Sequence, residues 1–283
     1  MASNPAFNRL EKDAQSGYAG FQDRGATANR GNASYAQQGG ADTWGSQQQL
    51  QDLYNQPTAG PVDTGRVTMD DVIMKTLGLF ALVLGFGAVG WYGADQSETL
   101  GLLFVMAWVP MFILGLVIAF KKTLSVPLIV GYAVVEGVFV GAISQFFENQ
   151  WNGVVPTAAL ATVATFSGMF LAYKTGLIKV TDKFRRIVTM MIIGYAIFAL
   201  VNYLVLPMFT GDMFGIGGTT GILISLFAVG LASVSLALDF DMIDRAIATG
   251  APQKYSWLLA HGLIVTVVWL YIEFLRLFAR LRE

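Results

Sequence analysis

Cysteine is absent from this sequence of 283 residues, histidine occurs once, and charged residues make up only 13% of it. The absence of cysteine excludes disulfides, thiol chemistry and cysteine-based metal sites. With His261 as its one histidine, a single chain cannot build a multi-histidine metal site. The net charge of −1 gives no reason to expect a nucleic-acid partner. The N-terminal stretch MASNPAFNRLEKDAQSGYAGFQDR has no apolar core, so we do not expect a signal peptide.

Apolar residues dominate instead: 54% of the residues are hydrophobic, and the mean hydropathy is +0.55. A soluble domain carries about a quarter charged residues. The apolar runs are each close to the roughly 20 residues that cross a bilayer, and small residues in them, as in GLFALVLGFGAVGWYG, predict close helix packing. The runs cover 72–93, 98–120, 125–147, 155–174, 186–208, 216–244 and 256–281. The sequence therefore predicts an all-α, polytopic membrane protein with a bundle of seven transmembrane helices in the lipid bilayer.

The N-terminal part of the chain differs from the rest. Residues 1–66 are rich in Gly, Gln, Asn, Ser and Ala and lack the apolar periodicity of a packed element. We predict a disordered cytoplasmic tail over 1–66 and a seven-helix transmembrane domain over 67–283. Thr68, Asp70 and Asp71 supply the start signal for the first helix.

Lysine and arginine fall in every second break between the runs. The basic residues are Lys121 and Lys122 in the second break, Lys174, Lys179, Lys183, Arg185 and Arg186 in the fourth, and Arg245 and Lys254 in the sixth. By the positive-inside rule, the tail and these breaks are cytoplasmic. Arg276, Arg280 and Arg282 near the C-terminus argue the reverse for the last run. That run is either re-entrant or a full span, and we favour the full span.

Three aspartates lie in LALDFDMIDR, at the end of the sixth run. On a helix, Asp241 and Asp244 share a face, and Asp241 can pair with Arg245. Asp239 lies about 160° around the helix from Asp241, so it is the aspartate that we expect to point into the bundle. Carboxylates within a membrane are functional candidates. The alternative is that all three are solvated at the cytoplasmic interface.

Three further ionisable residues lie within the apolar runs. An unpaired, ionised Glu136 near mid-membrane would be costly, so we expect it to be protonated, paired or facing water, with a structural hydrogen bond as the alternative. Glu273 can be neutralised by Arg276, three residues later. His261 could sit at the depth of Asp239 and sense pH, with a structural role as the alternative.

Motifs for catalysis are lacking. The sequence contains no nucleophile–base set, phosphate loop or metal-ligand spacing. An aspartyl-type site needs carboxylates from separate segments, whereas Asp239 and Asp241 are on one helix. We therefore expect no enzyme activity, no cofactor and no confident metal site.

Three stretches resemble a known family. GYAVVEGVFVGAIS is similar to its third helix, LALDFDMID to the end of its sixth, and LIVTVVWLYIEFLRLFARL to its last. The family is the Bax-inhibitor-one family, also called the transmembrane Bax inhibitor motif family, and the likeness is to its bacterial branch. It covers roughly residues 70–283, and we find no counterpart for 1–66.

The resemblance implies a bundle with a central last helix, in the plasma membrane, which is the inner membrane of a bacterium. It also implies, for some members, a pH-sensitive calcium leak. In these members two carboxylates on the sixth and seventh helices share protons and close the pore, and a basic residue after the second helix latches the sixth-helix aspartate. Asp239 matches that aspartate, because Ile243 follows it at the family's spacing. Lys121 and Lys122 lie where the latch would be.

The second carboxylate has two alternatives. Matching LYIEFLRLF puts it at Glu273, which needs extra residues in the preceding loop and lies about 30 Å along its helix, far beyond Asp239. Matching the start of the helix puts Thr266 there, and the proton-sharing pair is then missing.

Two hypotheses follow for function. The first is a cation leak, with Ca²⁺ as the transported ion, in which Asp239 is the gate and an aqueous path passes Asp239 and Glu136. Asp241, Glu273 and His261 are further gate candidates. The second is a non-conducting regulator that binds a membrane protease or another membrane complex through the tail 1–66.

Overall fold

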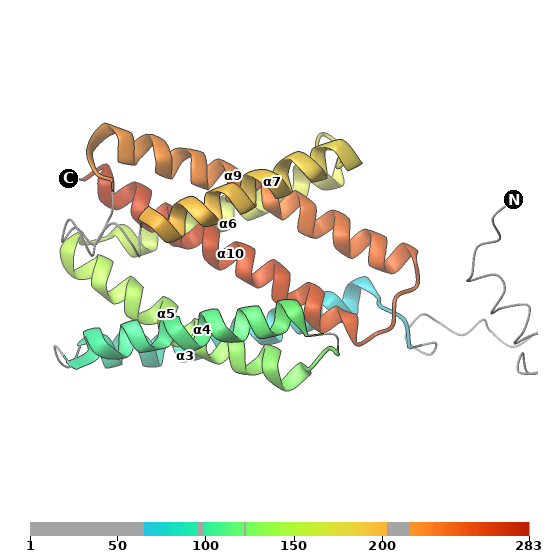
Figure 1. The fold of residues 1–283 in the computed structure, drawn as a ribbon, viewed down its shortest axis with the longest axis horizontal. Coiled ribbons are helices and arrows are strands. Elements are labelled where there is room, and N and C mark those ends of the chain that lie inside the picture. Colours follow the sequence, from blue (N-terminus) through green and yellow to red (C-terminus); the bar gives the residue numbers. More distant parts are fainter. Residues whose placement is uncertain (1–64, 96–98, 122, 203–215, 283) are drawn as a thin grey trace, which may run out of the picture. The chain divides into compact units, whose positions relative to one another are not determined.

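The computed structural model describes residues 65–95, 99–121, 123–202 and 216–282, and within these ranges the chain forms one helix in each predicted run (Figure 1). The helices are α3 (Met69–Asp95), α4 (Thr99–Phe120), α5 (Val126–Gln150), α6 (Val154–Lys174), α7 (Asp182–Leu200), α9 (Gly218–Ala248) and α10 (Tyr255–Arg280). Five of them, α3, α5, α6, α9 and α10, are long and apolar enough to cross a membrane. The prediction of an all-α membrane bundle is confirmed. The predicted tail, apart from its last two residues, lies outside the described ranges.

Local sequence signals set several helix ends. The Thr68 hydroxyl accepts a hydrogen bond from the Asp71 N–H at 3.1 Å, so the predicted start signal of α3 is confirmed. Pro127 stands in the first turn of α5, where its missing N–H is no loss. Gly176, with a φ of 74°, ends α6 in the left-handed conformation that glycine adopts most readily.

Helices α3 and α5 approach until their backbones touch. A Cβ atom added to Gly141 of α5 would lie 1.9 Å from the Gly87 carbonyl oxygen of α3. One added to Gly90 of α3 would lie 2.2 Å from the Val138 carbonyl oxygen of α5. Glycine at these positions is therefore a requirement of the contact, as in other membrane helix pairs built on small residues.

Helix α10 is the central element of the bundle. It contacts α3, α5, α6 and α9. Figure 1 shows it running between the group α3, α4 and α5 and the group α6, α7 and α9. Leu270 and Leu275 of α10 are completely buried. The expectation of a central last helix is confirmed.

Helix α10 also crosses the whole bundle. In its first turn, the Ser256 hydroxyl accepts a hydrogen bond from Lys75 Nζ, near the start of α3, at 2.6 Å. Beyond its last turn, Arg282 donates to the Asn152 carbonyl in the α5–α6 connection at 2.5 Å. The start of α3 and this connection lie at opposite ends of the bundle, because α3, α4 and α5 run in alternate directions. Helix α10 therefore runs the whole length of the bundle, as the favoured full span requires.

The arginines at the end of α10 have specific partners. Arg280 is only 6% exposed, and it donates to the Gly221 carbonyl at 2.5 Å and to the Ser225 hydroxyl at 2.6 Å, both in α9. Arg282 binds carbonyls of the α5–α6 connection. These charges therefore tie helix ends together, which explains why they occur at the end that the positive-inside pattern leaves without lysine and arginine.

The residues just before the predicted boundary at 67 already pair with the bundle. The Val67 N–H donates to the Ala251 carbonyl at 2.8 Å, and the Gln253 N–H donates to the Gly65 carbonyl at 2.7 Å. Val67 is 1% exposed. Gly65 and Arg66, which the sequence analysis assigned to the tail, are thus paired with the α9–α10 connection.

Candidate functional site

Asp239 points from α9 toward α10, as its position on the helix predicts. Its carboxyl interacts with the Thr266 hydroxyl of α10. Its Oδ2 atom is buried and has no hydrogen-bond partner among the described residues. The Thr266 hydroxyl also lies 3.2 Å from the Gly262 carbonyl, to which it can donate. One hydroxyl proton can serve only one acceptor at a time, so Thr266 can donate to an ionised Asp239 or accept from a protonated one.

Glu273 lies elsewhere on α10, in a site of its own. Its Oε1 atom accepts hydrogen bonds from the Tyr195 hydroxyl at 2.7 Å, from Trp269 Nε1 at 3.0 Å and from Arg276 at 3.0 Å. The predicted pairing of Glu273 with Arg276 is confirmed.

Of the two alternatives for the second carboxylate position, the structure places Thr266 beside Asp239. Glu273 is about 10 Å further along α10. The described residues therefore do not bring a carboxylate pair together at Asp239.

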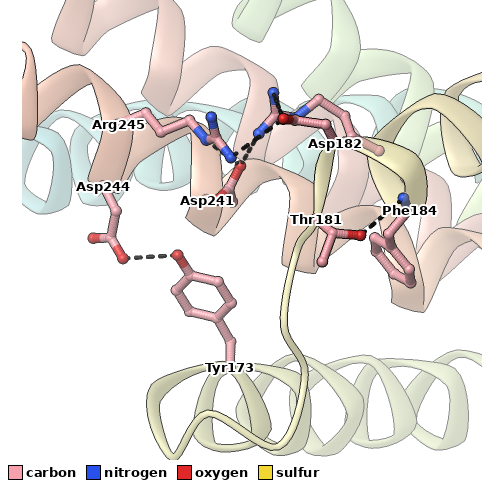
Figure 2. A network of polar contacts seen from close by, with 8 residues as sticks. Tyr173, Thr181, Asp182, Phe184, Asp241, Asp244 and Arg245 are labelled. Carbon is pink, nitrogen blue, oxygen red and sulfur yellow. Dashed lines mark hydrogen bonds and ion pairs between the residues drawn. The ribbon is translucent and has the colours of Figure 1, made fainter.

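Asp241 belongs to an ion network near the C-terminal end of α9. Arg280 contacts the opposite, N-terminal end of this helix. Asp241 Oδ2 lies 2.6 Å from Arg185 Nη2 of α7 and 2.8 Å from Arg245 Nε. Asp182, labelled in Figure 2, joins both arginines at 3.6 Å and 3.8 Å. The predicted pair of Asp241 and Arg245 is confirmed, and Arg185 is a partner that the sequence analysis missed. The network ties α7 to α9.

Asp244 has yet another neighbour. Its Oδ2 accepts a hydrogen bond from the Tyr173 hydroxyl of α6 at 2.8 Å (Figure 2). Asp239, Asp241 and Asp244 therefore face three different helices, α10, α7 and α6. They do not converge on one point.

Glu136 and His261 lie on the other side of α10, in contact with a shared tyrosine. The Tyr132 hydroxyl of α5 is within hydrogen-bonding reach of the Glu136 carboxyl. The Tyr132 ring meets the His261 ring edge-on, with 4.6 Å between centroids. His261 is about 7.5 Å from Thr266 along α10 and faces α5. We had hypothesised that His261 lies beside Asp239, and the structure shows that it does not.

The latch candidates are not at Asp239. Lys121 is exposed at the end of α4, beside Tyr255 and Leu258 of α10. No contact between Lys121 and Asp239 occurs in the described ranges. Lys122 lies outside those ranges.

Two polar contacts escaped the sequence analysis. Lys75 Nζ donates to Asp71 at 2.9 Å and to the fully buried Ser256, which connects α3 to α10. The hydroxyls of Ser144 and Tyr271 lie 2.7 Å apart and connect α5 to α10. The i,i+4 spacing of Asp71 and Lys75 was the one sequence signal that could have revealed either of these contacts. Among the described residues, no group of three His, Asp or Glu side chains could hold a metal ion.

Comparison with known proteins identifies the family. The model of the family described as Bax inhibitor 1 like matches residues 4–283, nearly the whole chain. The chain belongs to this family, and its apolar helices make it a multi-pass membrane protein. The match includes almost all of 1–66, which corrects our finding of no counterpart there. No curated protein matches the chain.

Proposed function

We propose that the protein is a cation leak, with Ca²⁺ as the transported ion, and that Asp239 lines the path. The observation that carries the proposal is the Asp239 Oδ2 atom, which is buried and has no hydrogen-bond partner among the described residues. A carboxylate placed there without a cationic partner is costly and is a functional candidate by default. Carboxylate and hydroxyl oxygens are hard ligands of the kind that Ca²⁺ prefers.

The pH response of this leak should be that of one carboxyl. Paired carboxylates titrate in two coupled steps, whereas Asp239 faces a threonine. Thr266 accommodates both charge states by donating or accepting, so a single proton can change the site without rebuilding it. In this proposal, a Lys121 latch belongs to another conformation, because Lys121 does not touch Asp239 in the one described.

Calcium flux into dye-loaded liposomes tests the proposal, across about pH 5 to 8. We expect a pH-dependent leak from the full chain, and a leak that has lost its pH dependence from Asp239→Asn. Asp244→Asn is the matched control, since Asp244 lies on the same helix but is exposed and binds Tyr173. Absence of flux at every pH from folded protein would overturn the proposal.

A second substitution tests the single-carboxyl response. Thr266→Asp should place a carboxylate beside Asp239 and make the pH dependence of the leak steeper, because the two would share protons. Thr266→Asn has nearly the same shape and lacks the charge, so it should keep the original steepness. Equal pH profiles for the two variants would contradict our assignment of Thr266 as the residue facing Asp239.

We also propose a plasma-membrane location, the inner membrane of a bacterium, with the N-terminus in the cytoplasm. Residues Gly65–Val67 pair with the α9–α10 connection, and Arg245 and Lys254 lie close to this connection in the sequence. These charges therefore lie at the end of the bundle where α3 begins. The positive-inside rule assigns such an end to the cytoplasm.

A non-conducting regulator is the second candidate function. The observation that favours it is Thr266, because a site without the second carboxylate lacks the proton-sharing gate implied by the family. Such a regulator would bind a membrane protease or another membrane complex through the N-terminal segment. Deleting residues 1–64 should then abolish recovery of the partner on purification and leave any calcium flux unchanged.

Neither candidate function involves enzyme activity. Asp239 faces α10 and Asp241 faces α7, so these aspartates cannot act together on one substrate. Neither function needs a cofactor.

A further inference from the structure

A second group of buried ionisable side chains lies between α5 and α10. Glu136 is 2% exposed, and Tyr132 and His261 are also buried. Tyr132 touches both of the others, through its hydroxyl to Glu136 and through its ring to His261. Glu136 Oε2 is buried and has no hydrogen-bond partner in the part of the chain that the structure describes.

In the part of the chain that the structure describes, no lysine or arginine forms an ion pair with this glutamate. The helices that pack against α5 are α3, α4, α6 and α10. Residues 76–94 of α3 contain one ionisable side chain, Tyr92, and neither 99–120 of α4 nor 154–172 of α6 contains any. Among the described residues, Tyr132 contacts Glu136, and His261 contacts Tyr132 in turn, so these are the two neighbouring groups that can exchange protons. A carboxyl buried in this way is far less costly when it holds a proton.

A pocket leads from the bundle surface toward this group. It opens at the end of α4 and is lined by Ile118, Lys121, Ser125, Ile129, Tyr255 and Leu258, among others. Lys121 and Tyr255 are its ionisable lining residues. The lining therefore comes from α4, the α4–α5 connection, α5 and the first turn of α10.

The ionisable group lies one helical turn deeper than this lining. On α5, Tyr132 follows Ile129 by three residues, and on α10 His261 follows Leu258 by three. On α4, Gly115 precedes Ile118 by three, and a Cβ atom at Gly115 would lie 3.5 Å from the Tyr132 ring. Residues three apart on a helix lie on the same face. Tyr132 and His261 are not part of the pocket lining, but they lie one helical turn beyond it, on the same faces of α5 and α10.

We propose that Glu136, Tyr132 and His261 form a proton-binding site, and that this site exchanges protons through the pocket with water at the Lys121 end of the bundle. His261 and Tyr132 come first along this route, and Glu136 is the buried acceptor. The site is separate from Asp239, which faces Thr266 on another side of α10. It does not depend on the leak proposed above.

Infrared difference spectra of the full chain in lipid nanodiscs test the site directly. The C=O stretch of a protonated carboxyl should appear as the pH is lowered across about pH 8 to 5. Glu136→Gln should remove one band of this kind, and Asp239→Asn should leave that same band in place. Spectra in which Glu136→Gln retains every carboxyl band of the parent chain would overturn the proposal.

A second pair of variants leaves the carboxyl intact and covers the case in which Glu136→Gln does not fold. Tyr132→Phe removes the hydroxyl next to Glu136, and the midpoint of the band should shift by about one pH unit. Tyr271→Phe is the matched control, because this partly buried α10 tyrosine bonds Ser144 and not Glu136. An unchanged midpoint in Tyr132→Phe, or equal shifts in both variants, would overturn the role of Tyr132.

The absence of native cysteine gives a clean test of the route. We expect the Glu136 carboxyl of the full chain to exchange hydrogen for deuterium rapidly through the pocket. In Leu258→Cys, a membrane-impermeant thiol reagent should label the pocket and make this exchange slow. Leu281→Cys, at the other end of α10, should take the label without slowing the exchange. Fast exchange that persists in labelled Leu258→Cys would overturn the proposed route.

Discussion

Two buried glutamates on either side of α10 have opposite surroundings. Glu273 and Glu136 are 1% and 2% exposed, respectively. One oxygen of Glu273 accepts hydrogen bonds from Tyr195, Trp269 and Arg276, whereas the described residues give Glu136 the Tyr132 hydroxyl as its one partner. The two glutamates are thus equally buried, but among the described residues only Glu273 has a cationic partner. A compensated glutamate can remain an ion that holds helices together, and an uncompensated one is suited to taking up and releasing a proton.

The helix contacts around the two residues differ in the same sense. Around Glu273, the Tyr195 ring of α7 stacks on the Trp269 ring of α10, with 5.7 Å between centroids, so aromatic side chains enclose the ion pair. Around Glu136, α5 meets α3 through glycine and bare backbone.

The largest expected effect comes from breaking the compensated site. Arg276→Met should lower the free energy of unfolding by about 3–5 kcal/mol, because it leaves Glu273 as a buried charge without a countercharge. Unfolding in mixed micelles measures it. The double variant Arg276→Met/Glu273→Gln should recover much of the loss, since no charge then remains. A stable Arg276→Met chain would contradict the ion pair as the basis of the comparison.

Next in size is the glycine contact between α3 and α5, the helix that carries Glu136. Gly141→Ala should cost about 3 kcal/mol, at the upper end for overpacking, because its Cβ would collide with the Gly87 carbonyl of α3. Gly131→Ala, on the same helix with no atom near the added Cβ, should be neutral or slightly stabilising. Similar thermal stabilities of the two variants would show that α3 and α5 do not touch as described.

A matched pair of tyrosine substitutions compares the two sites directly. Tyr195→Phe removes a hydrogen bond to an ionised Glu273 and should cost about 1.5–3 kcal/mol, whereas Tyr132→Phe removes one to a neutral Glu136 and should cost about 0.5–1.5 kcal/mol. Unfolding free energies of both variants, measured under one set of conditions, give the difference. The reverse order would mean that Glu136 is the charged residue of the two.

The smallest effect is expected at Glu136 itself. At about pH 5, where the proposed site holds its proton, Glu136→Gln replaces a neutral carboxyl with a neutral amide of the same shape, so the stability should change by less than about 1 kcal/mol. Circular dichroism on heating is sufficient to detect a larger loss. A loss as large as that of Arg276→Met would place a hidden countercharge at Glu136.

Interactions between near neighbours in the sequence were predictable. The Thr68 cap of α3, the pair of Asp241 and Arg245, and the pair of Glu273 and Arg276 each join residues three or four positions apart. Helical periodicity fixes such distances. The lengths of the apolar runs likewise placed the helices, because the bilayer sets the number of residues that each span needs.

Partners from distant segments could not be predicted in this way. Arg185 meets Asp241 across 56 positions, and Tyr195 meets Glu273 across 78. Which residue of α10 faces Asp239 depends on how far α10 is shifted along α9, and two shifts fitted the sequence. The angular position of Asp239 on its helix was sufficient to point it into the bundle, but its partner became known only from the packed helices.

The short pairing between Gly65–Val67 and the α9–α10 connection has a mechanical consequence. Two hydrogen bonds fasten the chain, just before α3, to the residues that lead into the first turn of α10. Tension applied to the N-terminal 64 residues is therefore carried to the base of the central helix before it can reach α3. Through this pairing, a pull on the N-terminal segment acts first on α10, the helix that holds both Thr266 and His261.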